Sequence, residues 1–347
     1  MKSLTLNKTW LLALTLIISL SLILSGCGGD KAVTTKSDGP IIAKFTHVVA
    51  AETPKGKAIQ YFATELEKRS NGRIKVEVYP SSQLYGDADE MEALVANNCQ
   101  FIAPSSTKVV SLDPGFQIFD LMFLFPTEES VIKFFNDPEG GQKMLSRLEK
   151  KGLVGIGFIP SGFKQWFNSK KPIVTPADMS GVKWRAAAGG ILTEQYTNMG
   201  STSVSIPFGE VYSALQLKTV DGSENSWANI YSQKFFEVCQ YITVSDHGRF
   251  DYSVISNKKF MDSLPEDLRA LVKSTWRDSQ DYAARIVKEE EENFKKQVLS
   301  SDKVKVVTLT PEQREAFKKS IEPTWNNWKS KIGEDIFERA LAASEAK

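Results

Sequence analysis

Few residues of this chain have the types and spacing that metal binding or covalent catalysis requires. The 347 residues include only two histidines and three cysteines. No two of them are spaced like a pair of metal ligands: His47, His247, Cys27, Cys99 and Cys239. The sequence also lacks a G-x-S-x-G elbow, an H-E-x-x-H motif, a phosphate-binding P-loop and a C-x-x-C pair. We therefore predict no cofactor, no metal and no enzymatic activity.

The charge balance limits the classes of partner. The chain has 43 Lys and Arg against 42 Asp and Glu, a net charge of +1. Residues 1–26 contribute Lys2 and Lys8 and no acidic residue, so the remainder carries −1 (41 against 42). Because nucleic-acid-binding proteins normally present a basic surface, nucleic acid is not a predicted partner. With 41% apolar and 10% aromatic residues, the chain can bury a large core, and its length suggests about two domains.

The first 26 residues have the features of a secretory signal. Lys2 and Lys8 precede an uncharged run at 10–24, which is shorter than the roughly 20 residues of a membrane-spanning helix. The sequence L-S-G-C at 24–27 resembles the bacterial lipobox, whose cysteine is acylated before cleavage. We expect a lipoprotein signal peptide at 1–26, lipidation at Cys27 with palmitate-type chains, and a flexible tether at 27–40. The alternative is an uncleaved membrane anchor.

From residue 41 onward, the hydrophobic spacing predicts alternating strands and helices. The first unit has strand patterns at 41–48, 73–79 and 101–103 and helical patterns at 54–70 and 87–98. A second unit begins near Gly162, with strand patterns at 182–185 and 204–206, helical patterns at 190–199 and 210–218, and a turn at 220–222. This order predicts an α/β protein with mostly parallel sheets flanked by helices.

A long helix is expected to link the two units. Ser263 and Glu266 have capping-box spacing, and the helical pattern that follows continues to about residue 298. At 1.5 Å per residue such a helix is roughly 50 Å long, more than the width of one compact domain. We expect lobe I to comprise residues 41–161 and 251–290, and lobe II to comprise residues 162–250 and 291–347.

An ordered set of motifs carries a family resemblance. The motifs are G-V-K-W-R at 181–185, I-P-F-G-E-V-Y-S-A-L-Q at 206–216, V-D-G-S-E-N at 220–225, K-F-F-E-V at 234–238, and then His247. Over residues 41–335 the chain closely resembles the solute-binding proteins of tripartite ATP-independent periplasmic (TRAP) transporters. T-H-V-V-A-A-E-T-P-K-G at 46–56, G-F-K-Q at 162–165 and S-D-H-G at 245–248 resemble the DctP/DctB branch, which binds C4-dicarboxylates.

The resemblance implies a two-lobed, periplasmic-binding-protein-like fold that closes on a small organic acid. The expected ligand is a C4-dicarboxylate (succinate, fumarate or malate), which the protein would deliver to TRAP membrane permease subunits. The protein would be an extracytoplasmic lipoprotein anchored to the cell membrane, in the periplasm of a Gram-negative cell or on the outer face of the cell membrane of a Gram-positive one. Two alternatives stay open. One is a co-receptor that presents a dicarboxylate to a membrane sensor kinase, and the other is a TRAP receptor for another carboxylate.

The resemblance also places ligand-binding residues in the second lobe. Arg185 occupies the position of the family's carboxylate-clamping arginine, whose planar guanidinium can donate two parallel hydrogen bonds. Asn225 matches an amide that holds the same carboxylate, and Phe208 matches an aromatic residue of the pocket wall. Lys164 lies where some members have arginine and would bind the distal carboxylate. Each residue also has a purely structural alternative. Arg185 could form a surface ion pair and Asn225 could be a turn residue. Phe208 could fill the core, and Lys164 could be a solvated lysine.

Further candidates come from the first lobe. His47 lies at the end of the strand pattern at 41–48, and Ser105 and Lys108 follow the pattern at 101–103. These are strand ends, where α/β sheets present ligand groups. Glu224 and His247 are expected to orient the guanidinium of Arg185 without contacting ligand. Lys164, Lys108 and Arg185 together would offset both charges of a diacid. Residues 186–190 read A-A-A-G-G where family members commonly have a polar residue, which leaves the identity of the diacid open.

Overall fold

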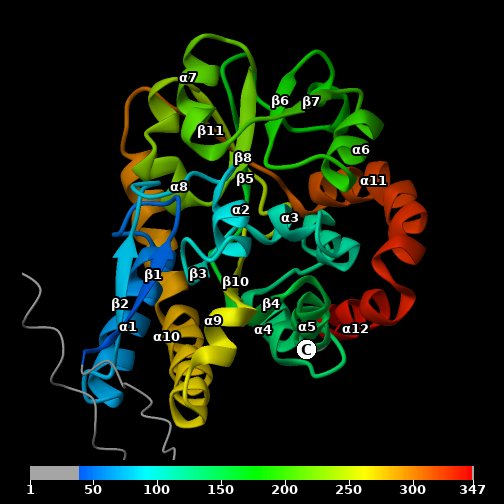
Figure 1. Cartoon of the computed structure of the whole chain (residues 1–347). Coiled ribbons are helices and arrows are strands. Elements are labelled where there is room, and N and C mark those ends of the chain that lie inside the picture. The colour runs from blue at the N-terminus through cyan, green and yellow to red at the C-terminus, as the bar shows by residue number, and fades with distance from the viewer. Residues whose placement is uncertain (1–38, 346–347) are drawn as a thin grey trace, which may run out of the picture. The chain divides into compact units, whose positions relative to one another are not determined.

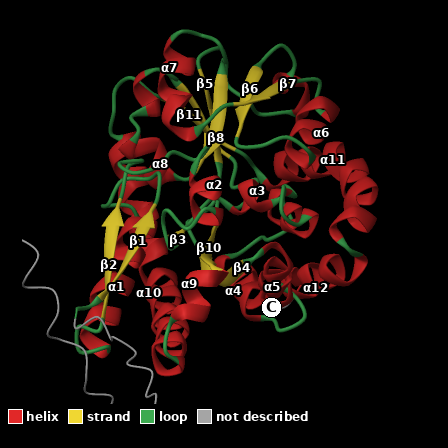
Figure 2. Ribbon diagram, in the orientation of Figure 1, coloured by secondary structure: helices red, strands yellow, loops and turns green. Residues whose placement is uncertain are grey.

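The computed structural model describes residues 39–345. The predicted signal segment, Cys27 and residues 27–38 of the predicted tether lie outside the described residues. The described part forms two sheets, each flanked by helices (Figures 1 and 2). This arrangement confirms the predicted two-lobed α/β class, and five of the nine strand pairings are parallel.

The first sheet has the strand order β2-β1-β3-β10-β4. Its strands are β1 (Ile41–Thr46), β2 (Ile74–Tyr79), β3 (Phe101–Ile102), β4 (Leu153–Ile159) and β10 (Tyr252–Asn257). β1 pairs in parallel with β2 and β3, whereas β10 pairs antiparallel with β3 and β4. The predicted strands at 41–48, 73–79 and 101–103 are confirmed within one or two residues at each end.

The second sheet has the order β11-β9-β5-β8-β6-β7. Its strands are β5 (Gln165–Asn168), β6 (Lys183–Ala186), β7 (Thr202–Ser205), β8 (Gly222–Asn225), β9 (Tyr241–Val244) and β11 (Lys305–Thr308). β6 lies between β8 and β7 and is parallel to both. β5 is antiparallel to β8 and β9.

Each of the five predicted helical patterns contains an α-helix, and residues 39–345 also form helices that were not predicted. The α-helices are α1 (Pro54–Arg69), α2 (Glu90–Val95), α3 (Ser106–Val109), α4 (Glu128–Asn136), α5 (Gly141–Arg147), α6 (Ile191–Asn198), α7 (Val211–Gln216), α8 (Trp227–Ser232), α9 (Lys258–Ser263), α10 (Glu266–Leu299), α11 (Pro311–Ile332) and α12 (Glu334–Glu345). Short 3-10 turns are η1 (Pro114–Asp120), η2 (Leu148–Lys151), η3 (Pro176–Met179), η4 (Phe208–Glu210) and η5 (Phe235–Glu237). α1 begins where Thr53 accepts a hydrogen bond from the Gly56 amide at 3.2 Å, followed by Pro54 in its first turn.

The long helix α10 is confirmed, and it packs against α1 and β4 of the first sheet's layer and against α8 of the second. Its predicted cap is wrong. Ser263 ends α9, where its hydroxyl donates to the Phe260 carbonyl at 2.7 Å, and Pro265 is the residue that precedes α10. Because proline has no amide hydrogen and a fixed φ, it can separate two helices without leaving an unpaired donor.

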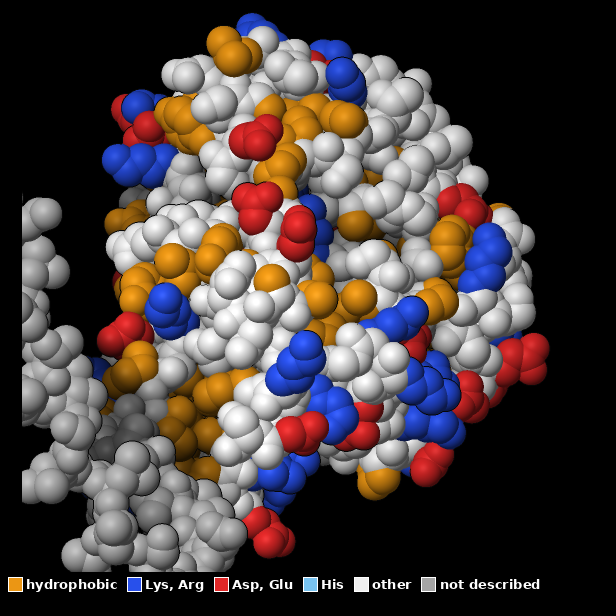
Figure 3. Space-filling model, viewed as in Figure 1, with side chains coloured by type: hydrophobic (Ala, Val, Ile, Leu, Met, Phe, Trp, Pro, Cys, Tyr) orange, Lys and Arg blue, Asp and Glu red, His pale blue; other side chains and the backbone are white. Residues whose placement is uncertain are grey.

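The last helix, α12, packs against α4 and η1. Ion pairs link α12 to its neighbours. Asp335 of α12 contacts Lys143 and Arg147 of α5, and Arg339 of α12 contacts Asp137. On the face drawn in Figure 3, Lys and Arg side chains are accordingly intermixed with Asp and Glu. The predicted lobe boundaries assign α12 to lobe II and α4 to lobe I, and they stay a prediction. Within residues 39–345, no helix has both the length and the apolar character needed to cross a membrane.

Candidate ligand-binding site

A small cavity lies where segments from both sheets meet. Its walls come from the ends of β1, β3 and β6, from α2 and η4, and from the approach to β10. The lining residues are Val48, Asp87, Glu90, Ser105, Lys108, Arg185, Ala187, Phe208, Phe250 and Tyr252. The empty space is about 320 Å³, including the part open to solvent. Its position at strand ends is the usual place for ligands in α/β folds.

Arg185 is the principal cation of this cavity. It lies on β6 with 1% of its surface exposed, and its Nε donates to the Ile206 carbonyl at 2.9 Å. Its Nη1 is buried and has no hydrogen-bond partner among the described residues. Burial lowers the pKa of Arg185 to about 10, while Asp87 and Glu224 act in the opposite direction, so the side chain is charged at neutral pH. The site therefore holds a fixed guanidinium with an unused donor.

Asp87 joins the two sides of the cavity. Its Oδ1 accepts a hydrogen bond from the backbone amide of Phe208 at 3.0 Å, and its Oδ2 lies 3.3 Å from Nζ of Lys108. Phe208 belongs to the layer of the second sheet, whereas Asp87 and Lys108 belong to that of the first. Ser105 forms an isolated antiparallel bridge to Tyr252 on the same wall. The positive charge of Lys108 is thus already partly offset.

Glu90 and Lys55 were missed by the sequence analysis. Glu90 is 1% exposed, lines the cavity, and has neither carboxyl oxygen hydrogen-bonded to a described residue. Lys55 is equally buried, with Nζ donating to the Ala103 carbonyl at 2.6 Å and lying 3.9 Å from the centre of the Tyr252 ring. The sequence did indicate that Glu90 is buried. It precedes the apolar residues Ala93 and Leu94 by three and four positions, so it lies on the same buried face of α2.

Burial dominates the electrostatics of this pair. It raises the pKa of Glu90 to about 8, against the opposing effect of Lys55, and it lowers the pKa of Lys55 to about 8, against the effects of Glu90 and Asp87. Both groups therefore titrate in a mildly alkaline range rather than at their ordinary values.

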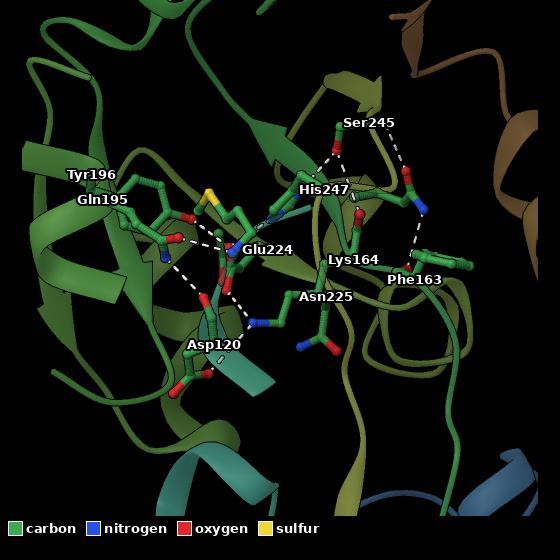
Figure 4. Close-up of polar contacts among 12 residues, drawn as sticks. Asp120, Phe163, Lys164, Gln195, Tyr196, Glu224, Asn225, Ser245 and His247 are labelled. Atoms are coloured by element: carbon green, nitrogen blue, oxygen red, sulfur yellow. Dashed lines mark hydrogen bonds and ion pairs between the residues drawn. The ribbon is translucent and has the colours of Figure 1, made fainter. Parts of the chain in front are cut away.

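Lys164 does not line the cavity but belongs to a separate polar cluster (Figure 4). Its Nζ is 2.8 Å from Glu224 Oε1 and 4.0 Å from Asp120 Oδ1. Glu224 Oε2 also contacts the Tyr196 hydroxyl and His247 Nε2, each at 2.8 Å. The only link of Lys164 to the cavity wall among these contacts is the Phe250 ring, whose centre lies 5.7 Å away. The charge of Lys164 is offset within the cluster. Of the three cations that the sequence set against the two charges of a diacid, Lys108 and Arg185 therefore remain in the cavity.

The protonation states of the cluster follow from its contacts. Burial alone would raise the pKa of Glu224, but Lys164 and His247 hold it below the usual range. Burial lowers the pKa of His247, which is therefore neutral at pH 7. Both ring nitrogens of His247 are satisfied when Nε2 donates to Glu224 and Nδ1 accepts from the Ser245 hydroxyl at 2.7 Å. Neither Glu224 nor His247 makes a hydrogen bond to Arg185 in the described residues, where we expected them to orient it.

Asn225 and His47 lie outside the cavity wall. Oδ1 of Asn225 accepts from Asn229 Nδ2 at 2.7 Å, and the same nitrogen lies 3.0 Å from the hydroxyl of Tyr252. His47 is fully buried, with no partner for either ring nitrogen among the described residues, beside another hollow that Tyr61 also lines.

The structure thus places four of the seven predicted ligand residues around one cavity: Arg185, Phe208, Ser105 and Lys108. Lys164 and Asn225 lie one side chain behind it, and His47 precedes the lining residue Val48. The ligand-contacting roles of all seven stay predictions.

Comparison with known proteins places this geometry in context. Residues 45–331 match the DctP model, described as "Bacterial extracellular solute-binding protein, family 7". The C4-dicarboxylate-binding periplasmic protein DctP of Shewanella loihica is 39% identical over 306 residues, which cover 88% of this chain and 90% of the relative. The C4-dicarboxylate-binding protein DctB of Bacillus subtilis is 33% identical over 305 residues, covering 87% and 86%.

Solved structures agree with this match. A TRAP periplasmic solute-binding protein from Shewanella oneidensis with bound succinate superposes with a TM-score of 0.85 at 38% identity, covering 88% of this chain and 100% of that one. The sugar acid-binding protein DctPAm of Advenella mimigardefordensis, in complex with galactonate, gives 0.84 at 31% identity, covering 88% and 98%.

Proposed function

Because the chain belongs to the DctP family of bacterial extracellular solute-binding proteins, we propose that it binds a C4-dicarboxylate and delivers it to a TRAP-type secondary transporter. The observation that carries the proposal is the cavity between the two sheets, with buried Arg185 on its wall and Nη1 of that residue unpaired. A buried guanidinium with a free donor suits a carboxylate, which accepts charge-assisted hydrogen bonds. The proposal that the ligand is a four-carbon diacid rests on the names of the relatives, which bind C4-dicarboxylates or succinate.

A screen of organic acids by thermal shift tests this proposal. A ligand at 100 times its dissociation constant should stabilise the protein by about 2.7 kcal/mol. Succinate, fumarate and malate should raise the melting temperature, and calorimetry should show that the monoamide of succinate binds about 2–5 kcal/mol more weakly, because it leaves a buried cation unpaired. Equal affinity for butyrate and succinate would contradict the diacid assignment.

A sugar acid is the second candidate ligand. The galactonate-bound neighbour supports it, as does the carboxylate of Asp87 in the cavity, since carboxylates accept hydrogen bonds from hydroxyl groups. Sugar acids of four to six carbons therefore belong in the same screen. Tighter binding of a sugar acid than of any C4-dicarboxylate would make the protein a TRAP receptor for that acid.

The partner after ligand binding is proposed to be the TRAP permease. A membrane sensor kinase is the alternative, because both partners would use the same liganded form. Reconstitution with the permease subunits in vesicles distinguishes them: substrate uptake that depends on this protein supports transport. Uptake that proceeds unchanged without it would favour the sensory role.

Attachment to the membrane is proposed to occur through acylated Cys27, which lies outside the described residues. The support is the L-S-G-C sequence at 24–27 after a short apolar run. Cys27→Ser should move the protein from the membrane fraction to the aqueous fraction. Continued membrane fractionation of the variant would show that residues 10–24 remain as an anchor.

A further inference from the structure

The carboxyl group of Glu90 is the most unusual polar group of the cavity. It is 1% exposed, and neither of its oxygens meets a hydrogen-bond donor in the described residues. The nearby ammonium of Lys55 donates to the Ala103 carbonyl instead. Burying an ionised carboxylate without donors is costly, so such a group either takes up a proton or awaits a partner from outside the chain. The cavity is where that partner would lie.

The charges around the cavity define what the partner must be. The lining cations are Lys108 and Arg185, and the lining acidic groups are Asp87 and Glu90. Lys55 does not line the cavity, but it acts electrostatically on Glu90 and is counted with them. With Glu90 ionised, three positive charges face two negative ones, which leaves +1. With Glu90 protonated, the surplus is +2, the charge that a dicarboxylate dianion would neutralise. Lys164 does not enter this count because Glu224, 2.8 Å away in the separate cluster, offsets its charge.

We propose that Glu90 contacts the ligand as a neutral carboxylic acid and donates a hydrogen bond to one carboxylate of a bound dicarboxylate. This inference rests on the proposed function and adds a residue that selects for a dianion. No proton is transferred to the ligand: the hydrogen stays on Glu90 and is shared in the hydrogen bond. Where free Glu90 is ionised, it must first take a proton from solvent, so binding there is coupled to proton uptake.

The surroundings of Glu90 support this behaviour. The charged and titratable groups that act on it are Lys55 from α1, Asp87 from the preceding loop and Lys108 from α3, and Glu90 in turn acts on Cys99 before β3. Burial is the largest influence and raises the pKa of Glu90 to about 8. A dianion next to the carboxyl group raises it further, because like charges disfavour ionisation. Binding should therefore weaken as the pH rises through 8, where the free carboxyl group loses its proton.

The test compares succinate affinity at pH 7.5 and pH 9 in the wild type and in Glu90→Gln. Simple titration of a group with a pKa near 8 predicts that the wild type loses about eightfold in affinity. Glu90→Gln keeps a hydrogen-bond donor and cannot ionise, so it should lose less and should match the wild type near pH 7; the loss that remains measures the titration of Lys55, whose pKa also lies near 8. Glu92→Gln, an exposed position on the same helix, is the matched control and should behave like the wild type.

Calorimetry of the wild type at pH 8.5, in two buffers of different ionisation enthalpy, gives the number of protons taken up and needs no variant. We expect net uptake with succinate at pH 8.5 and much less at pH 6. A wild type without uptake at pH 8.5, or a Glu90→Gln protein with the wild-type pH profile, would overturn the inference while leaving the proposed function intact; the second result would assign the titration to Lys55. Failure of every C4-dicarboxylate to bind at any pH would instead overturn the proposed function and the inference with it.

Discussion

At the scale of single residues, Arg185 offers the sharpest prediction. Its Nε is held by the Ile206 carbonyl, so the guanidinium plane is fixed before ligand arrives. Arg185→Lys keeps the charge but loses the planar guanidinium that donates two parallel hydrogen bonds. We expect calorimetry to show about 30- to 150-fold weaker diacid binding, or roughly 2–3 kcal/mol. Arg185→Ala should bind more weakly still. Arg73→Lys, at an exposed ion pair, is the control and should bind normally. A folded Arg185→Ala protein with unchanged affinity would remove Arg185 from the site.

Glu224 offers a prediction about stability rather than affinity. Glu224→Gln would leave buried Lys164 without its nearest counter-charge, and we expect a loss of about 3–5 kcal/mol in the free energy of unfolding at pH 7. Because the pKa of Glu224 is below its usual value in the folded protein, its contribution is present above the unfolded pKa and lost as the pH falls. Urea titrations should therefore show the difference shrinking below about pH 4. A difference that stays constant down to pH 3 would mean that the carboxylate charge is not what stabilises the cluster.

Single residues also show what the sequence could and could not predict. Arg185, Phe208, Ser105 and Lys108 were found from motif context and from their places after strands, and the fold brings all four to one cavity. The partners of Lys164 could not be found in this way. Glu224 is 60 residues away in sequence, and Asp120 approaches from η1, so only the tertiary fold shows that they offset its charge. Glu90 was overlooked because an acidic residue in a first helical turn is normally explained by the helix dipole.

At the scale of elements, the segment that enters β5 depends on Gly162. This residue has φ of +102°, and a Cβ there would lie 2.8 Å from the carboxyl group of Glu291 on α10. Gly152 also has a positive φ, +73°, but a Cβ there would meet no atom within 4 Å. Gly152→Ala should therefore cost about 1–2 kcal/mol for the backbone alone, and Gly162→Ala about 1–3 kcal/mol more. Chemical denaturation of both variants measures the difference; equal losses would show that the Glu291 side chain or α10 moves aside at little cost.

The elements themselves were predictable where apolar periodicity is strong, as in α1 and α10. Strand β8 was not: residues 220–222 were predicted as a turn, yet Gly222 begins the strand. All four residues of β8, Gly222–Asn225, are buried, and three of them are polar, so the apolar alternation that indicates a strand is missing. Glycine is required because a Cβ at 222 would lie 2.5 Å from the Phe167 carbonyl. Prediction from the local hydrophobic pattern fails here because the strand buries the polar side chains of Glu224 and Asn225 in the interior.

At the scale of the whole molecule, the remaining question is whether ligand brings the two lobes together. The cavity has walls from both sheets, and the hydrogen bond from the Phe208 amide to Asp87 is a direct contact between them. A ligand that touches both walls can make all of its contacts only when the lobes are close, so it should shift an open–closed equilibrium by its difference in affinity for the two states.

Fluorescence energy transfer can measure this shift. Labels at Lys150→Cys and Leu217→Cys would sit on exposed positions of the first and second lobes, and Cys99 and Cys239 are buried and should stay unlabelled in the folded protein. In a Cys27→Ser background, saturating succinate should raise the transfer efficiency. Arg185→Ala should need at least about 30-fold more succinate to reach the same efficiency, because the second lobe then holds the carboxylate less tightly. If the efficiency does not change at saturation, while calorimetry on the same labelled protein shows binding, the ligand must bind without closure, and the contact between Asp87 and Phe208 must persist in both states.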